Sequence, residues 1–264
     1  LRGCGEGVDE ELSTKIAEVR KSLKDKRRQA YVERGAVQTG EEGSLWNPLR
    51  ELELPGFYVD LHEVTNKEYG RFVAEAGADP PPSWPSGKIP SGAEDEALTG
   101  ITFEEAQRFA AARGGRLPTP AEWEKAARGA EPHTWPWGDE PREAGCNWAG
   151  LGHARPLKPG SLPKDISTPY GLFDMAGNVS EWTYGEGIGS SEKTRSRAAA
   201  WVRGGAYMTA LFDNTRVAFV AEAGFGDQRD PAVGFRCVYD LEEGTGEDAE
   251  QEPEQESDEG EDGE

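Results

Sequence analysis

The chain has 264 residues, a length that allows one large domain or two small ones. Hydrophobic residues make up 35% of it, and 34 Gly with 18 Pro indicate many loops and short strands rather than a helical bundle. The formal net charge of −21 is uneven: residues 240–264 hold 14 acidic and no basic residues, so the other 239 carry only −7. This balance argues against a nucleic-acid partner, and no run of about 18 apolar residues predicts a membrane-spanning helix.

The first four residues, Leu1-Arg2-Gly3-Cys4, resemble the end of a bacterial lipoprotein signal peptide. In such peptides a Leu three positions before the Cys, and a small residue just before it, guide lipidation of the Cys. We therefore expect Cys4 to carry acyl chains and to tether the protein to a membrane outside the cytoplasm, in the periplasm or at the cell surface. The alternative is an unmodified Cys in an unstructured terminus.

Two further cysteines, Cys146 and Cys237, leave two readings open. Outside the cytoplasm they could form a disulfide, which would close a loop of about 90 residues and stabilise the fold by about 4 kcal/mol on the chain-entropy model. The alternative is a pair of buried thiols.

The first segment of the chain predicts one amphipathic helix over residues 9–34, because apolar residues recur along one face: Leu12, Ile16, Val19, Leu23 and Ala30. A turn-rich break at residues 38–43 ends this unit, which we assign to residues 1–43. The globular domain, residues 44–240, then begins, and Phe57-Tyr58-Val59-Asp60-Leu61 predicts its first clear strand.

Three helices should follow, because the same N-terminal signal occurs three times. Thr65, Thr102 and Thr119 are each followed three positions later by Glu, the pattern of a capping box. Pro120 at the first helical position strengthens the third signal. Glycines stand where each helix should end: Gly77, Gly114 and Gly129.

The segment Gly171-Leu172-Phe173-Asp174-Met175-Ala176-Gly177-Asn178-Val179-Ser180-Glu181-Trp182 is too polar and too broken for a core helix or strand. Gly177 and Asn178 readily adopt positive φ, so the chain can curl and turn its carbonyls inward. Curled carbonyls beside the carboxylates of Asp174 and Glu181 would suit Ca²⁺. The alternative is a polar turn in which Glu181 pairs with a nearby Arg while Trp182 fills the core.

The last folded part should contain strands at residues 201–203 and 235–239. Residues 241–264 contain Glu, Asp, Gly, Gln and Ser without aromatics, so they cannot bury enough surface to order themselves, and we expect a disordered acidic tail.

The segment 171–182 resembles the signature of the formylglycine-generating enzyme (sulfatase-modifying factor) family, and two other segments support the resemblance. They are Asp60-Leu61-His62-Glu63-Val64-Thr65-Asn66 and, more specifically, Arg116-Leu117-Pro118-Thr119-Pro120-Ala121-Glu122-Trp123 with its continuation to Gly129. With the last folded portion, from Trp201-Val202-Arg203-Gly204-Gly205 to Gly234-Phe235-Arg236-Cys237-Val238, the matches cover about residues 57–239. The resemblance implies an α+β, C-type-lectin-like fold with short strands, few helices and long loops.

The resemblance also implies calcium at this turn. The matching family positions bind Ca²⁺ through side chains, here Asp174 and Glu181, and through main-chain oxygens, here those of Gly177 and Val179. All four positions are intact.

Catalysis is where the sequence departs from the family. Its authentic enzymes oxidise a substrate Cys with copper and oxygen, and they hold the copper between two cysteines. The closest positions here are Thr209 and Asn214, neither of which supplies the thiolate that Cu(I) requires. The chain is therefore similar to the cysteine-free branch of the family, which includes non-catalytic and ligand-binding members.

These observations predict a surface-anchored, calcium-braced, non-catalytic domain that recognises a protein or a glycan. The recognition surface is expected in the segment that lines the family's substrate groove, where aromatics alternate with short polar groups. Its expected residues are Tyr207, Thr209, Phe212, Asp213, Asn214, Phe219 and Asp227. The alternative is an oxidase of the formylglycine-generating type, or another metalloenzyme, that acts on a peptide.

Overall fold

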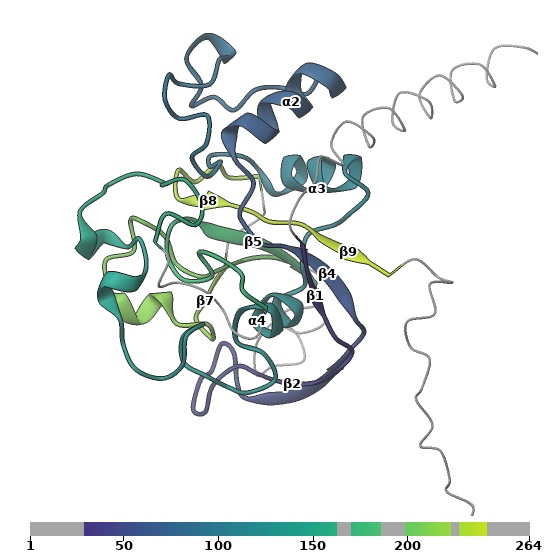
Figure 1. Cartoon of the computed structure of the whole chain (residues 1–264), viewed down its shortest axis with the longest axis vertical. Helices are drawn as coiled ribbons and strands as arrows, with labels where there is room; N and C mark the ends of the chain where they lie inside the picture. Colours follow the sequence, from purple (N-terminus) through teal and green to yellow (C-terminus); the bar gives the residue numbers. More distant parts are fainter. Residues whose placement is uncertain (1–28, 163–169, 186–198, 223–226, 242–264) are drawn as a thin grey trace, which may run out of the picture.

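The computed structural model of this protein describes residues 29–162, 170–185, 199–222 and 227–241 (Figure 1). Short strands in three sheets combine with a few helices, which agrees with the expected α+β class. None of the described helices has the length and apolar character needed to cross a bilayer. Cys4, most of the first predicted helix and the acidic tail from residue 242 onward lie outside the described residues.

The chain enters the fold through strands rather than a helix. β1 (Gln29–Val32) pairs antiparallel with β4 (Phe57–Asp60), and β2 (Gly35–Thr39) pairs with β3 (Arg50–Leu54). The prediction of one helix as far as Arg34 is therefore wrong over its last residues. Pairing with β4 buries Val32 completely, and this long-range contact overrides the helical pattern. The folded domain consequently begins by Gln29, before the expected boundary at residue 44.

The three helices begin as the capping boxes predicted. α2 (Asn66–Ala76), α3 (Phe103–Ala112) and α4 (Pro120–Arg128) each have a Thr N-cap whose side chain accepts from the third residue, while the Glu at that position accepts from the Thr backbone. Gly77 ends α2 with a left-handed φ of 66°, and Gly129 ends α4. Local sequence signals therefore predicted the helix boundaries better than the strand boundaries.

The central four-stranded sheet has the order β7-β6-β5-β8, formed by β7 (Val220–Glu222), β6 (Ala199–Arg203), β5 (Ser180–Gly185) and β8 (Val233–Gly234). β5 runs antiparallel to β6 and parallel to β8. β9 (Val238–Asp240) joins β4 in the sheet β1-β4-β9. Of the strand expected at residues 235–239, only residues 238 and 239 lie in a strand, β9, while Phe235, Arg236 and Cys237 form a buried connection between β8 and β9.

Two hydrophobic clusters form the core of the described part of the fold. One gathers α2, α3 and Trp182, and its rings include Tyr69, Phe72 and Phe109. The other packs Trp123 of α4 against Phe57 and Leu172. In Figure 1 the chain that follows α4, residues 130–160, forms with residues 205–216 the edge of the fold opposite β9. Three single-turn 3-10 helices belong to this edge: η2 (Glu143–Gly145), η3 (Ala149–Leu151) and η4 (Phe212–Thr215).

Candidate functional site

The turn before β5 has the backbone that its sequence predicted. Gly177 and Asn178 have φ angles of 78° and 57°, and Asp174 also has a positive φ of 57°. At Gly177 an added Cβ would lie 2.6 Å from the carbonyl oxygen of Asn147, so only glycine fits there. The turn is therefore held against residue 147 and places both of its carboxylates in the interior.

Glu181 is fully buried and already saturated with donors. Its Oε1 accepts from Arg236 at 2.7 and 3.0 Å, and its Oε2 accepts from Arg236 Nε and from Trp123 Nε1, both at 2.8 Å. Trp182, next in the chain, lies in the core. The structure therefore shows the arginine pairing and the buried Trp182 that the second reading expected, whereas calcium binding stays a prediction.

Two more carboxylates share the environment of Arg236. Asp174 Oδ2 accepts from the Gly160 amide at 2.6 Å, and both oxygens of Glu63 accept from Asn178 Nδ2 at 3.1 and 3.2 Å. Burial raises the pKa of Asp174 to about 6. Burial, and then the carboxylates of Asp174 and Glu181, raise the pKa of Glu63 well above its usual range. The cluster therefore combines three buried carboxyl groups with one guanidinium, and it favours an additional proton or cation.

The four residues predicted to hold calcium do not all fit that role in this arrangement. An ionised carboxylate offers about four lone-pair positions, and those of Glu181 are occupied by Arg236 and Trp123. Asp174 keeps acceptor capacity, and the carbonyls of Gly177 and Val179 belong to the same turn. Binding through all four groups would require Glu181 to exchange part of its contact with Arg236 for the ion, so calcium stays a prediction.

The two cysteines agree with the second alternative, a pair of buried thiols. Cys146 and Cys237 are buried thiols and are not joined in a disulfide. Cys237 lies 3.7 Å from Arg113 Nη1 within the α2–α3 cluster.

Thr209 and Asn214, at the family's copper positions, do come together in space. A Cβ on Gly205 would lie 3.2 Å from Thr209 Oγ1 and 3.0 Å from the main-chain carbonyl oxygen of Asn214, so the Thr209 side chain and the Asn214 main chain lie beside the same glycine. Thr209 Oγ1 accepts from the Ala206 amide at 2.7 Å and fixes this turn. The two positions therefore lie near one another, and their side chains, a hydroxyl and an amide, are hard donors rather than the soft thiolates that Cu(I) prefers.

The other residues of the predicted recognition surface are dispersed. Phe212 and Asp213 lie on η4 beside Asn214, and Asp213 is exposed. The Tyr207 hydroxyl points elsewhere and donates to the Pro231 carbonyl at 3.2 Å. Phe219 lies just before β7, and Asp227 is exposed at the start of the last described segment. The structure therefore groups Thr209, Phe212, Asp213 and Asn214 and does not place the remaining three among them.

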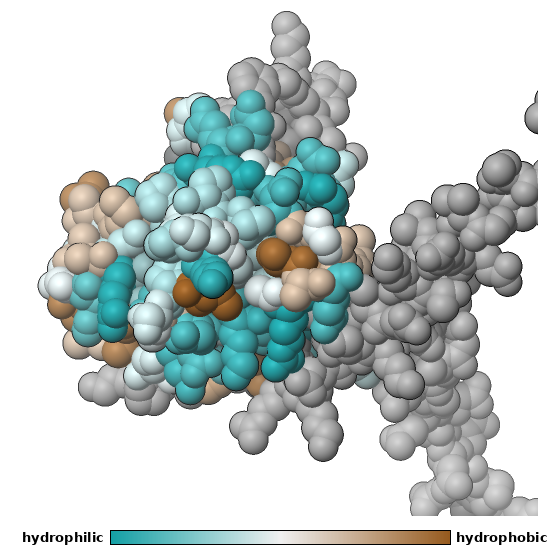
Figure 2. Space-filling model, turned by 90° about the horizontal axis from the view of Figure 1, so that it is seen from above, coloured by the Kyte–Doolittle hydropathy of each residue, from teal (hydrophilic) through white to brown (hydrophobic). Residues whose placement is uncertain are grey.

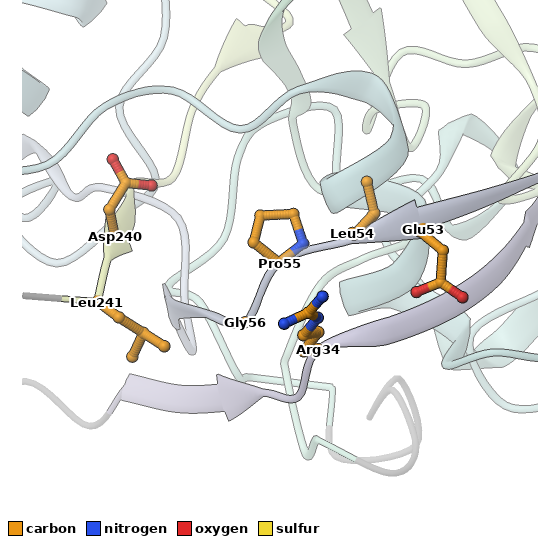
Figure 3. A pocket seen from close by; sticks show the side chains of 7 residues that line it. All are labelled: Arg34, Glu53, Leu54, Pro55, Gly56, Asp240 and Leu241. Carbon is orange, nitrogen blue, oxygen red and sulfur yellow. The ribbon is translucent and has the colours of Figure 1, made fainter. Parts of the chain in front are cut away.

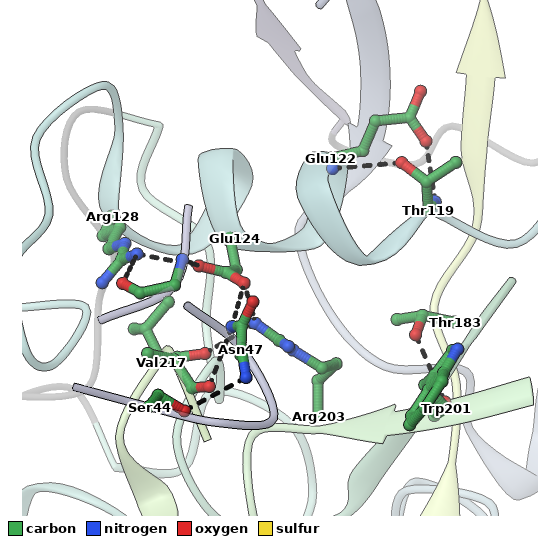
Figure 4. A network of polar contacts seen from close by, with 12 residues as sticks. Ser44, Asn47, Thr119, Glu122, Glu124, Arg128, Thr183, Trp201, Arg203 and Val217 are labelled. Atoms are coloured by element: carbon green, nitrogen blue, oxygen red, sulfur yellow. Dashed lines mark hydrogen bonds and ion pairs between the residues drawn. The ribbon is translucent and has the colours of Figure 1, made fainter. Parts of the chain in front are cut away.

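A second buried polar network is centred on Glu124 of α4 (Figure 4). Glu124 of α4 accepts from Arg128 at 2.8 Å, from Asn47 at 2.7 Å and from the Gly40 amide at 2.8 Å, and it pairs with Arg203 of β6. Arg203 also donates to the Val217 carbonyl at 2.9 Å, just after η4. One carboxylate therefore joins α4, β6, the β2–β3 loop and the segment after η4.

A pocket of about 470 Å³ opens on another part of the surface, where β9 ends (Figure 3). Arg34, Glu53 and Asp240 give it mixed charge, and Leu54, Pro55, Gly56 and Leu241 complete its lining. None of the predicted recognition residues lines it, so we assign it no role.

The fold and its substituted copper positions define a C-type-lectin-like domain of the formylglycine-generating type without that site's thiolates. The model of the sulfatase-modifying factor enzyme 1-like domain matches residues 15–241, and the chain belongs to this family.

Known proteins agree with this placement. The chain is 31% identical over 173 residues to the uncharacterized protein YfmG of Bacillus subtilis, a match that covers 53% of this chain and 36% of YfmG. It is 32% identical over 167 residues to hercynine oxygenase of Mycolicibacterium smegmatis, covering 52% and 39% of the two chains. Among solved structures, Treponema denticola variable protein 1 superposes with a TM-score of 0.66 at 17% identity and covers 80% of this chain and 94% of its own, which shows the fold alone. The matched region spans well under half of either curated relative.

Proposed function

We propose that this chain is a non-catalytic binding domain that recognises a protein or a glycan through the surface around η4. The supporting observation is the pair of residues at the family's copper positions, Thr209 and Asn214, whose side chains offer a hydroxyl and an amide instead of two thiolates. The chain's two described thiols, Cys146 and Cys237, are buried. The buried ion pair of Glu124 and Arg203 also supports the chain just after η4, because Arg203 donates to the Val217 carbonyl.

A second candidate is an oxidase or other metalloenzyme of the same family that acts on a peptide. It is favoured by the similarity to hercynine oxygenase, whose name denotes an oxygenase. In that case the reactive metal would have to be held by oxygen and nitrogen ligands.

Metal analysis separates the two candidates, and it also tests calcium. We expect the purified chain to contain calcium in a one-to-one ratio without copper or iron. Calcium at a hundredfold excess over its Kd would stabilise the fold by about 3 kcal/mol. Asp174→Ala is then expected to lower the Tm more in calcium than in chelator, because only the calcium-bound state loses a ligand.

Two results would contradict these expectations. A tightly bound redox metal, with oxygen consumed in the presence of a peptide, would support the enzyme. An equal loss of Tm for Asp174→Ala in calcium and in chelator would remove the ion and leave Asp174 structural. For Glu181→Ala we expect a loss in both conditions, because its pairing with Arg236 needs no calcium.

We also propose that acyl chains on Cys4 anchor the domain to a bacterial membrane outside the cytoplasm. Metabolic labelling of the full-length precursor with a radioactive fatty acid should label the wild-type protein and spare Cys4→Ser. Unlabelled wild-type protein would contradict the anchor. A pull-down from native membranes would then identify the partner.

A further inference from the structure

Four aromatic rings from three separate segments stack into one continuous row beside η4. Trp135 contacts Trp137, with 6.3 Å between the ring centroids and 1° between the ring planes. It also contacts Phe212, with 5.3 Å between the centroids and 26° between the planes. Trp148 also contacts Phe212, edge-on, with 5.4 Å between the ring centroids. Trp135 is buried, whereas the other three rings are partly exposed. We call Trp137, Phe212 and Trp148 the aromatic face.

The aromatic face is held rigid by its own hydrogen bonds. Trp135 Nε1 donates to Thr215 Oγ1 at 3.2 Å, and the indoles of Trp137 and Trp148 donate to the carbonyls of Glu140 and Glu143, both at 2.9 Å. With every indole N–H satisfied, the ring surfaces remain for a ligand. Rings fixed in advance lose little conformational entropy on binding, which favours recognition.

Gly150 shows how closely Trp148 is seated. A Cβ on Gly150 would lie 2.2 Å from the Trp148 ring, so the indole lies flat against this backbone. The glycine therefore fixes the position of the ring that ends the row, and a methyl group there would displace it.

The rim of the aromatic face is acidic. The bonds just described hold the main chains of Glu140 and Glu143 beside Trp137 and Trp148. Asp213 follows Phe212 directly, and all three acidic residues are exposed. Arg142 adds a positive charge between the two glutamates, whereas the nearby Arg216 is already paired with Glu41 at 2.9 Å. Apolar side chains continue the surface, since Met208 and Leu211 are 55% and 65% exposed. In Figure 2 hydrophobic (brown) atoms gather along the left edge, the side on which residues 205–216 lie in Figure 1.

From this combination we infer that the aromatic face binds a basic segment of a protein partner, with an arginine or lysine side chain over the rings and its charge paired with Glu143 or Asp213. Cations are attracted to the faces of Trp and Phe, and the carboxylates at the rim add direct pairing. A glycan would use the same rings without needing the carboxylates. The inference rests on the proposed binding function and names its partner class.

The test uses a ten-residue peptide of alternating Arg and Ser, with chitohexaose as the glycan probe, and measures the Kd by calorimetry with the full chain at 150 mM salt. Trp148→Ala should weaken peptide binding about tenfold, and Asp213→Asn about threefold. Gly150→Ala should reproduce the effect of Trp148→Ala, because it displaces the same ring. Glu104→Gln, an exposed charge on α3, is the matched control and should leave the Kd unchanged.

Three outcomes would overturn the inference. Equal peptide binding by the wild type, Trp148→Ala and Asp213→Asn would show that the chain's overall negative charge, rather than the aromatic face, attracts the peptide. Chitohexaose binding that needs Trp148 and ignores Asp213 and salt would make the face a glycan site, which leaves the proposed binding function intact. Absence of peptide binding would also reject a basic partner, while the metal analysis would still decide between binding protein and enzyme.

Discussion

Replacing Glu124 with glutamine is expected to lower the free energy of unfolding by about 3–5 kcal/mol, the usual cost of breaking a buried ion pair. The Glu124, Arg128 and Arg203 side chains are at most 1% exposed, so water cannot take over the lost contacts. Glutamine keeps the shape but removes the only negative charge in Figure 4 that contacts the two guanidiniums. For a chain of this size the Tm should fall by about 10 °C.

Urea unfolding at pH 7 measures this effect. Glu104→Gln makes the same chemical change at an exposed position of α3, and its stability should stay within about 0.5 kcal/mol of the wild type. A loss below about 1 kcal/mol in Glu124→Gln would show that other groups balance the charges of Arg128 and Arg203.

The same substitution should also loosen the β2–β3 loop. Asn47 and the Gly40 amide bind Glu124, and between them the loop exposes Leu45 at 76% and Trp46 at 65%. Faster proteolysis at Leu45 and Trp46 in Glu124→Gln than in Glu104→Gln would show that Glu124 anchors the loop. The carboxylate thus joins the stability of the fold to the shape of its surface.

The helices could be predicted from sequence because their signals are local. Each Thr-x-x-Glu pattern completes its hydrogen bonds within four residues, so no tertiary information is needed. The positive φ of Gly177 and Asn178 could be predicted for the same reason. β1 could not, because its pairing with β4 joins segments about 30 positions apart, and this pairing overrides the helical periodicity of residues 9–34.

In the candidate site, too, local features could be predicted from sequence and long-range contacts could not. Asp174 and Glu181 stand out in sequence as carboxylates of one polar turn, but the residues that decide their chemistry are remote. Arg236 lies 55 positions after Glu181, and Glu63 lies 115 positions before its partner Asn178. Both residues occur in segments that resemble the family, and that was the one available signal. The aromatic face likewise joins Trp137, Trp148 and Phe212 from three segments with no common periodicity.

Replacing Arg236 with leucine is expected to destabilise the protein as strongly as Glu124→Gln, by about 3–5 kcal/mol at pH 7. The substitution leaves the carboxyl groups of Glu63, Asp174 and Glu181 buried without a cation. It also removes donors to the carbonyls of Asp60, Leu61 and Phe173, at distances of 2.8–3.2 Å. Arg108→Leu, at an exposed position of α3, is the control and should cost little.

The pH dependence identifies the electrostatic part of this loss. Because the folded-state pKa values of Asp174 and Glu63 are raised, the folded protein binds protons more tightly than the unfolded chain. Their stabilising contribution is therefore full below about pH 4, where the unfolded carboxyls titrate, and is lost as pH rises through the folded pKa, about 6 for Asp174. Without Arg236, which lowers both pKa values, this loss should become larger and extend to higher pH.

Urea unfolding at pH 5, 6, 7 and 8 in chelator should then show the smallest difference between Arg236→Leu and wild type at pH 5. An equal difference at every pH would mean that Arg236 acts through packing and its carbonyl contacts alone, and adding Asp174→Asn to Arg236→Leu should restore stability at pH 8 only if charge is the cause.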